Sequence, residues 1–206
     1  MLYEEYQRMN KKIFAALAAL ALPMTGIAAE EGLKFGASNS NMNYTYVQGA
    51  FVDVDFGTGL ALEGSYQFHD KFFVFGQFED VSDDPFSQTT IAFGAGTSMA
   101  LNDKFDIYGK AGFYSLEWEM EQVCFFGQCV GGSDDDSGLG FEFGTRGMVM
   151  PQLEVFADFK FIMLDDNVTG FDLGARYWVN DRFGVSFQLT DLEESDGFVL
   201  AARYEF

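Results

Sequence analysis

The feature that most constrains this chain is an alternation of apolar and polar side chains that recurs from about residue 43 onward. Between residues 60 and 68, Leu60, Leu62 and Phe68 fall on one parity, and Glu63 and Gln67 fall on the other. A period of two is typical of β-strands with one apolar and one polar face. Ten segments are therefore predicted strands: 44–57, 59–69, 72–80, 89–101, 105–119, 138–149, 152–163, 168–179, 182–190 and 197–206.

The connections between these segments predict how the strands are joined. Four are tight turns, at 69–71, 102–104, 150–152 and 180–182. They alternate with longer acidic connections at 80–88, 120–137, 164–168 and 191–196, and only the first, around 57–59, is short. Tight turns at one end and longer loops at the other are typical of an all-β, up-and-down antiparallel transmembrane β-barrel. We predict ten strands, with eight as the alternative if two short segments are loop.

The polar parity of the strands carries both signs of charge. In a membrane barrel the apolar face meets lipid and the polar face lines the interior, whereas a soluble lipocalin-like barrel has the reverse arrangement. On the membrane reading, five acids and five bases face inward: Glu63, Glu79, Glu142, Asp158, Asp172, Lys110, Arg146, Lys160, Arg176 and Arg203. An unpaired buried charge costs several kcal/mol. We therefore expect a paired network that largely plugs the lumen, with Glu79 reaching water at one mouth.

The segment before the first predicted strand has the layout of an export signal. Residues 9–12 form a short positive start, an apolar stretch covers 13–23, and small residues cover 25–29. This predicts a signal peptide at 9–29 that is cleaved after Ala28 or Ala29; the apolar stretch is too short to cross a bilayer as a helix. Residues 1–8 are a doubtful upstream extension, because two acids precede the positive start and suggest Met9 as the true start. A flexible lead-in, 30–42, and the barrel domain, 43–206, complete the chain.

The charge balance excludes one class of partner. The chain has 32 acidic and 12 basic residues, a net charge of −20, and without residues 1–29 the net charge is −21. Nucleic-acid binding needs clustered Lys and Arg, so nucleic acid is not an expected partner. Runs of acids in the predicted connections, such as 134–136, could bind divalent cations weakly or bridge them to lipid phosphates. A merely solvated acidic surface is the other interpretation.

Cysteine and histidine are the residue types most often used for chemistry, and the chain has few of either. Cys124 and Cys129 are the only cysteines, and in an exported protein they predict a local disulfide in the longest connection. His69 is the only histidine and falls in a tight turn. No catalytic residue, metal ligand or cofactor site is expected from the sequence.

Aromatic residues gather beside the predicted tight turns. A membrane barrel carries girdles of aromatic side chains at the two lipid interfaces, so these residues are expected to face outward. They are Tyr44, Tyr46, Phe68, Phe72, Phe105, Tyr177, Phe183, Tyr204 and Phe206.

Four stretches carry a resemblance to a known family: 44–47 at the opening of the barrel, 64–66, 72–76, and the closing Arg203-Tyr204-Glu205-Phe206. In these the chain resembles the small outer-membrane β-barrel proteins of Gram-negative bacteria, the porin-like and opacity-protein-like single-chain barrels. The resemblance implies an outer-membrane location, contact with membrane lipid and lipopolysaccharide, and insertion by the barrel-assembly machinery. It also implies that Tyr204 and Phe206 form the signal read by that machinery.

The resemblance does not specify a function, because the family includes structural, adhesive and pore-like members. The first hypothesis is a non-enzymatic envelope protein with a structural or surface-interaction role. The second is a narrow channel for ions or small solutes. The third, an outer-membrane enzyme, is disfavoured by the position of His69.

Overall fold

The computed structural model describes residues 42–125, 128–192 and 195–206, without the side chains of 122–130 and 192. The upstream extension 1–8, the predicted signal peptide 9–29 and all of the predicted lead-in except Met42 lie outside the described residues. No helix in the described part of the chain is long and apolar enough to cross a membrane.

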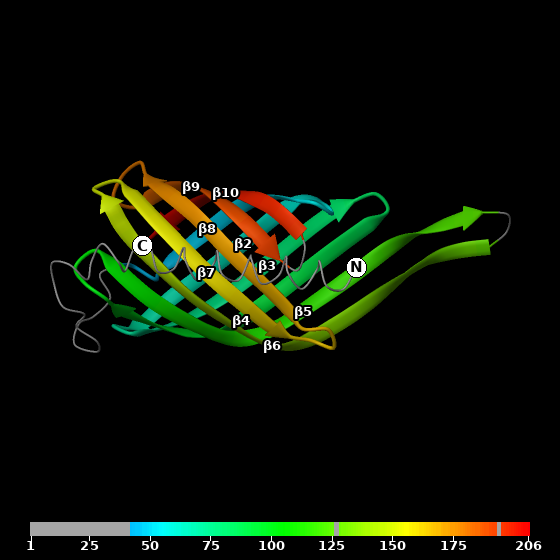
Figure 1. Ribbon diagram of the computed structural model, residues 1–206, viewed down its shortest axis with the longest axis horizontal. Helices are drawn as coiled ribbons and strands as arrows, with labels where there is room; N and C mark the ends of the chain where they lie inside the picture. Colours follow the sequence, from blue (N-terminus) through cyan, green and yellow to red (C-terminus); the bar gives the residue numbers. More distant parts are fainter. Residues whose placement is uncertain (1–41, 126–127, 193–194) are drawn as a thin grey trace, which may run out of the picture.

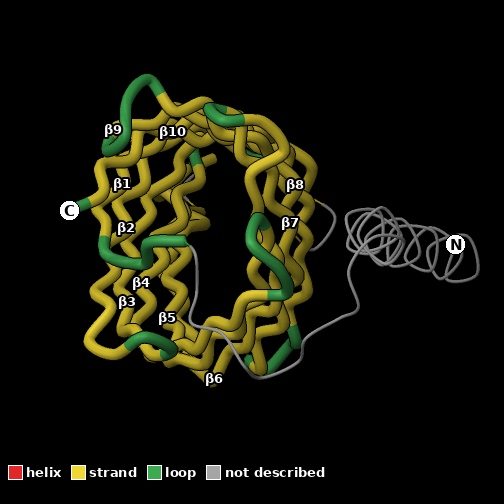
Figure 2. The backbone as a smooth tube through the Cα atoms, turned by 90° about the vertical axis from the view of Figure 1, so that its left-hand side faces the viewer, coloured by secondary structure: helices red, strands yellow, loops and turns green. Residues whose placement is uncertain are grey.

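Ten antiparallel strands form one closed barrel, in which each strand pairs with its neighbours in sequence and β1 pairs with β10 (Figures 1 and 2). The strands are β1 Tyr46–Val54, β2 Gly57–His69, β3 Phe72–Asp83, β4 Phe86–Ala100, β5 Phe105–Phe125, β6 Gln128–Met150, β7 Leu153–Met163, β8 Val168–Trp178, β9 Phe183–Leu192 and β10 Ser195–Glu205. The prediction of an all-β, up-and-down barrel of ten strands is confirmed, and the eight-strand alternative is wrong.

The barrel is apolar outside and charged inside. Leu60, Tyr66 and Phe143 point outward and are 67%, 61% and 59% exposed, whereas Glu154 and Asp106 point inward and are fully buried. This distribution is the reverse of that in a soluble barrel, because large apolar side chains exposed on every strand need lipid around them. The sequence prediction of which parity faces the lumen is correct.

The predicted difference in loop length is wrong. At the end that holds Tyr46 and Glu205, which we call the turn end, short turns join the strands, as expected. At the opposite end β3 continues to Asp83 and β4 starts at Phe86, so that most of the predicted loop 80–88 is strand. The same holds for the predicted loop 120–137. Backbone groups of two facing chains satisfy each other in a continued ladder, so the hairpins extend instead of opening into loops.

The longest hairpin, β5–β6, projects beyond the rest of the barrel (Figure 1). β4 pairs with β5 only up to Met120, and β7 pairs with β6 only from Leu139. We call residues 121–125 and 128–138 the paddle, and the end of the barrel that carries it the paddle end. Over residues 128–138, β6 pairs with β5 alone among the described strands.

Inward aromatic rings lie against the wall over glycines one or two strands away. A Cβ atom added to Gly140 would collide with the ring of Tyr114, and one added to Gly144 would collide with the ring of Tyr108. Phe73 over Gly96, Phe75 over Gly112 and Phe156 over Gly174 repeat the arrangement. At these positions glycines make room for the rings that fill the lumen.

Candidate functional site

The lumen is the candidate site, because it gathers most of the buried charge. At its turn end lies a cluster that we call the arginine layer: Arg146, Arg176, Glu154 and Glu205. Nε and Nη2 of Arg146 donate to the two carboxylate oxygens of Glu154 at 2.9 and 3.1 Å. Nη1 of Arg176 donates to Oε1 of Glu154 at 2.9 Å. Nε1 of Trp178 donates to Oε2 of Glu154 at 3.0 Å.

The chain just before β1 covers this layer. The carbonyl oxygen of Asn43 accepts a hydrogen bond from Nη1 of Arg146 at 3.0 Å. The ring of Tyr44 is buried, stacks on Phe73 with 4.8 Å between ring centroids, and lies 5.2 Å from Cζ of Arg146. The expectation that Tyr44, Tyr46 and Phe105 belong to an outward girdle is therefore wrong, because all three are buried. Tyr44 and Tyr46 line the lumen cavity.

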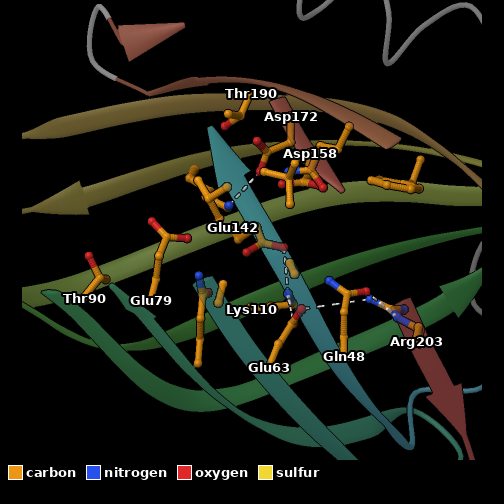
Figure 3. A pocket seen from close by; sticks show the side chains of 18 of the residues that line it. Gln48, Glu63, Glu79, Thr90, Lys110, Glu142, Asp158, Asp172, Thr190 and Arg203 are labelled. Atoms are coloured by element: carbon orange, nitrogen blue, oxygen red, sulfur yellow. Dashed lines mark hydrogen bonds and ion pairs between the residues drawn. The ribbon is translucent and has the colours of Figure 1, made fainter. Parts of the chain in front are cut away.

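A second cluster, the central layer, lies further along the lumen and consists of Glu63, Lys110, Glu142 and Arg203 (Figure 3). Nζ of Lys110 lies 2.9 Å from Oε1 of Glu142 and 3.4 Å from Oε1 of Glu63. Nη2 of Arg203 is 4.0 Å from Oε2 of Glu63. Oε1 of Gln48 accepts from both Arg203, at 2.9 Å, and Arg176, at 3.1 Å, and so joins the two layers.

A pair of aspartates faces the central layer. Asp158 and Asp172 are directly opposite each other in the β7–β8 register. Nζ of Lys160 lies 2.6 Å from Oδ2 of Asp172. Asp158 accepts from the hydroxyl of Tyr108 at 3.1 Å, and its other carboxylate oxygen is buried with no hydrogen-bond partner in the described structure. The two carboxyl groups therefore share one lysine.

The structure places all ten sequence-predicted charges in the lumen. Eight of them form ion pairs: Glu63, Lys110, Glu142, Arg146, Lys160, Asp172, Arg176 and Arg203. Asp158 and Glu79 have no ion pair with the described residues. Three further acids point inward, Asp106, Glu154 and Glu205. The sequence puts Glu154 and Glu205 on the polar faces of their strands, but none of the three was counted in the predicted network. The lumen thus holds eight acids and five bases, and the expected balance of five against five is wrong.

A cavity of about 170 Å³ runs through the lumen, and its lining includes Tyr44 near the turn end and Phe56 at the paddle end. Between the charged clusters and the paddle end, the wall of the cavity becomes more apolar, with Val52, Leu116 and Ile162 among the lining side chains. A wider space of about 800 Å³ at the paddle end adjoins it, because Phe56, Leu116 and Ser195 line both. We call the apolar part of the lumen cavity, together with this wider space, the cup.

The remaining predicted residues lie away from the lumen. Tyr204 and Phe206 point outward near the turn end, with their rings 5.2 Å apart. The backbones of Cys124 and Cys129 are directly opposite in the β5–β6 register, and their side chains lie outside the described part. His69 is exposed at the end of β2, directly before the turn to β3. No group of three or more His, Cys, Asp or Glu in the described chain is arranged to hold a metal ion.

Comparison with known proteins gives a family model and several solved structures. The family model, described as "Outer membrane protein beta-barrel domain", matches residues 14–177, which is more than half of the chain. No curated protein sequence matches.

Three solved structures with a similar fold are compared with the chain. The KdgM porin is 9% identical, with 79% of this chain and 99% of that chain covered at a TM-score of 0.48. Ail, the attachment invasion locus protein of Yersinia pestis, is 17% identical, with 78% and 95% covered at 0.41. The outer membrane protein Omp33 of Acinetobacter baumannii is 14% identical, with 81% and 100% covered at 0.43. At these identities and TM-scores the similarities carry no information about ligands.

Proposed function

The chain belongs to the outer membrane protein beta-barrel family, and from this premise we propose that it is a non-enzymatic envelope barrel with a largely plugged lumen and an acidic, surface-exposed paddle end. Its role is structural or one of surface interaction. The observation that carries the proposal is the arginine layer together with Tyr44, which fills the turn end of the lumen with paired charges and one buried ring.

The free space beside this plug is small. A cavity of 170 Å³ has room for about a dozen water molecules, spread over a lumen that is roughly 25 Å long for about ten residues of tilted strand. Solute channels in porins are water-filled and are built from about 16–18 strands. The lumen of this barrel therefore favours a hydrated, side-chain-filled interior over a solute path.

The surface role follows from the orientation of the barrel. Short turns and both ends of the barrel domain lie on the periplasmic side in such proteins, which puts the paddle end outside the cell. There the barrel presents the acids of the paddle and of the neighbouring hairpins, for example Asp135 and Asp166. Contacts with membrane lipid and lipopolysaccharide, bridged in part by divalent cations at these acids, are part of the proposal, as is export by the signal peptide at 9–29.

Conductance across a planar bilayer tests the plug. The purified, refolded protein should give no steady ohmic current. The double variant Arg146→Ser/Glu154→Ser removes the three ion pairs that these two residues form, with each other, with Arg176 and with Glu205, without changing the net charge. It should raise the conductance, which also shows that inserted barrels are detected. A steady current through the unaltered protein would contradict the proposal and favour the channel.

The channel is kept as the second candidate because of one observation. The cavity lining includes residues of both ends of the barrel, Tyr44 and Phe56. A narrow file of water through this cavity would pass small ions only. The excess of acids over bases in the lumen would then favour cations, and the reversal potential in a salt gradient would show it.

A further inference from the structure

The upper part of the lumen differs in chemistry from the part below it. Around the cavity at the paddle end many inward side chains are apolar: Val52 and Val54 on β1, Leu116 on β5, Ile162 on β7 and Val199 on β10. Leu116 and Ile162 are only 3% and 5% exposed and belong to one buried apolar cluster. A few polar side chains, Thr90, Gln188 and Thr190, line the cavity with them, and ligand pockets are likewise mostly apolar with a few placed polar groups.

One carboxylate beside this zone, that of Glu79, has no close ion pair, and Lys160 acts on it only from a distance. Glu79 lies on β3 and lines the cavity, and Figure 3 shows it beside Thr90 and apart from the paired charges of the central layer. It forms no ion pair or hydrogen bond with any residue of the described structure. A carboxylate against apolar walls is costly unless a cation reaches it, so the position of Glu79 is one that a positively charged ligand would stabilise.

The entrance to the zone is aromatic and acidic. Phe56, Phe86 and Trp118 line the wider space at the paddle end, together with Asp55 and Glu119. Nε1 of Trp118 donates to Oε1 of Gln88 at 3.1 Å, which holds the indole at this wall. Aromatic faces attract organic cations as well as apolar groups.

The surrounding charges have the sign that a cation needs. All lysines and arginines of the described chain lie either in turn-end turns, as Lys71, Lys104 and Arg182 do, or in the lumen. The base that acts on Glu79, Lys160, is itself paired with Asp172 at 2.6 Å. The acids that line the entrance, Asp55, Glu119 and Asp134, have no base among the residues that line it with them, and their negative charge raises the local concentration of cations.

We propose that the cup is a binding site for a small organic cation with an apolar or aromatic group, such as an arylalkyl amine. The ammonium group contacts Glu79, and the apolar group packs between Val52, Leu116 and Ile162. The aromatic side chains Phe56 and Trp118 lie along the way in. The site goes beyond the proposed function, because a plugged barrel and a conducting barrel could both carry it.

Binding is measured by calorimetry on the barrel in nanodiscs of zwitterionic lipid, with phenethylammonium chloride as the probe. The matched anion, 3-phenylpropionate, has a similar ring and chain and should bind at least tenfold more weakly. Glu79→Gln should weaken binding of phenethylammonium at least tenfold. Asp135→Asn, which removes an exposed paddle acid outside the cup, should leave it unchanged.

Three outcomes would overturn the site: equal binding of the two ions, unchanged binding to a folded Glu79→Gln barrel, or an equal loss in Asp135→Asn, which would mean attraction by surface charge alone. If Glu79→Gln does not fold, Trp118→Ala, at the entrance of the cup, replaces it as the test. Binding of phenethylammonium to this variant should be at least threefold weaker, and unchanged binding would contradict the site. Because no current is measured, failure here leaves the conductance result for the proposed function intact.

Discussion

Glu154 accepts four hydrogen bonds from three side chains, Arg146, Arg176 and Trp178. Its carboxylate is completely buried and is the shared partner of two guanidinium groups. Glu154→Gln would leave both arginines charged and poorly paired, and breaking a buried pair in this way costs about 3–5 kcal/mol. We expect the midpoint of urea unfolding of the refolded barrel to fall accordingly.

The control for this variant is Asp135→Asn, at an exposed position on the paddle. A surface substitution of this kind should change the free energy of unfolding by no more than about 0.5 kcal/mol. Identical unfolding midpoints for the two variants would show that the arginine layer does not hold the barrel together.

Gly144 tests the filling of the lumen by aromatic rings. The ring of Tyr108 occupies the space that a Cβ at Gly144 would take, and its hydroxyl donates to Asp158 at 3.1 Å. Gly144→Ala should displace the ring, break this hydrogen bond and destabilise the barrel by about 1–3 kcal/mol. Gly49→Ala, where nothing lies within 4 Å of the added Cβ, is the matched control. A loss in Gly144→Ala no larger than that in the control would refute the packing argument.

At the scale of single residues, the sequence predicted well which side chains face the lumen, and poorly which charged side chains pair with each other. Parity alone puts Glu154 on the same face as Asp158 and Lys160, so it could have been included. Which acid meets which base depends on strand register and side-chain length, and these are not encoded in the spacing along one strand. Glu63, for example, meets Lys110 from across the lumen, 47 residues away.

The paddle carries the two cysteines. Cys124 and Cys129 are directly opposite in an antiparallel pair, where Cα atoms lie about 4.5–5.5 Å apart, within the range that a disulfide bridges. We expect them to be oxidised and to stabilise the hairpin tip by about 2 kcal/mol, without being needed for barrel folding. Thiol labelling of the unfolded, non-reduced protein checks this, and two labelled thiols would refute it.

The pairing of β1 with β10, which closes the barrel and which we call the seam, is extended by hydrogen bonds of Phe206. Its backbone N–H donates to the carbonyl of Thr45 at 3.1 Å, and its carbonyl accepts from Nδ2 of Asn43 at 3.0 Å. Its side chain is 69% exposed and faces lipid. Removing Phe206 should therefore lower the amount of assembled barrel in membranes severalfold more than removing Asp135 does. Equal assembly of the two would speak against a terminal signal at Tyr204 and Phe206.

Most strands were predicted to within a few residues, but the extensions of β5 and β6 were not. The stretch 120–137 contains glycines and a run of acids, which are poor strand formers. In the barrel, Asp134, Asp135 and Asp136 face Trp118, Glu117 and Leu116 across a continuous ladder. Cross-strand pairing decided the structure there, and local propensity did not.

The molecule as a whole lies in the outer membrane, as its family does. We expect cell fractionation to find it there and unboiled samples to migrate differently from boiled ones on detergent gels, because a closed barrel resists unfolding by detergent. Recovery from the periplasm as a soluble protein with no heat-dependent shift would contradict the membrane orientation of the two faces.

The seam also determines the order in which the barrel can be completed. Nine of the ten strand pairings join neighbours in sequence and can form as soon as both strands have arrived. The tenth joins Tyr46 to Glu205, and the entropy of closing a loop grows with its length. Delivery from the amino terminus therefore leaves a curved, open sheet with two unsatisfied edges until β10 is in place. During that interval, a chaperone or assembly factor has to shield those two edges. Once β10 pairs with β1, no edge is left to shield.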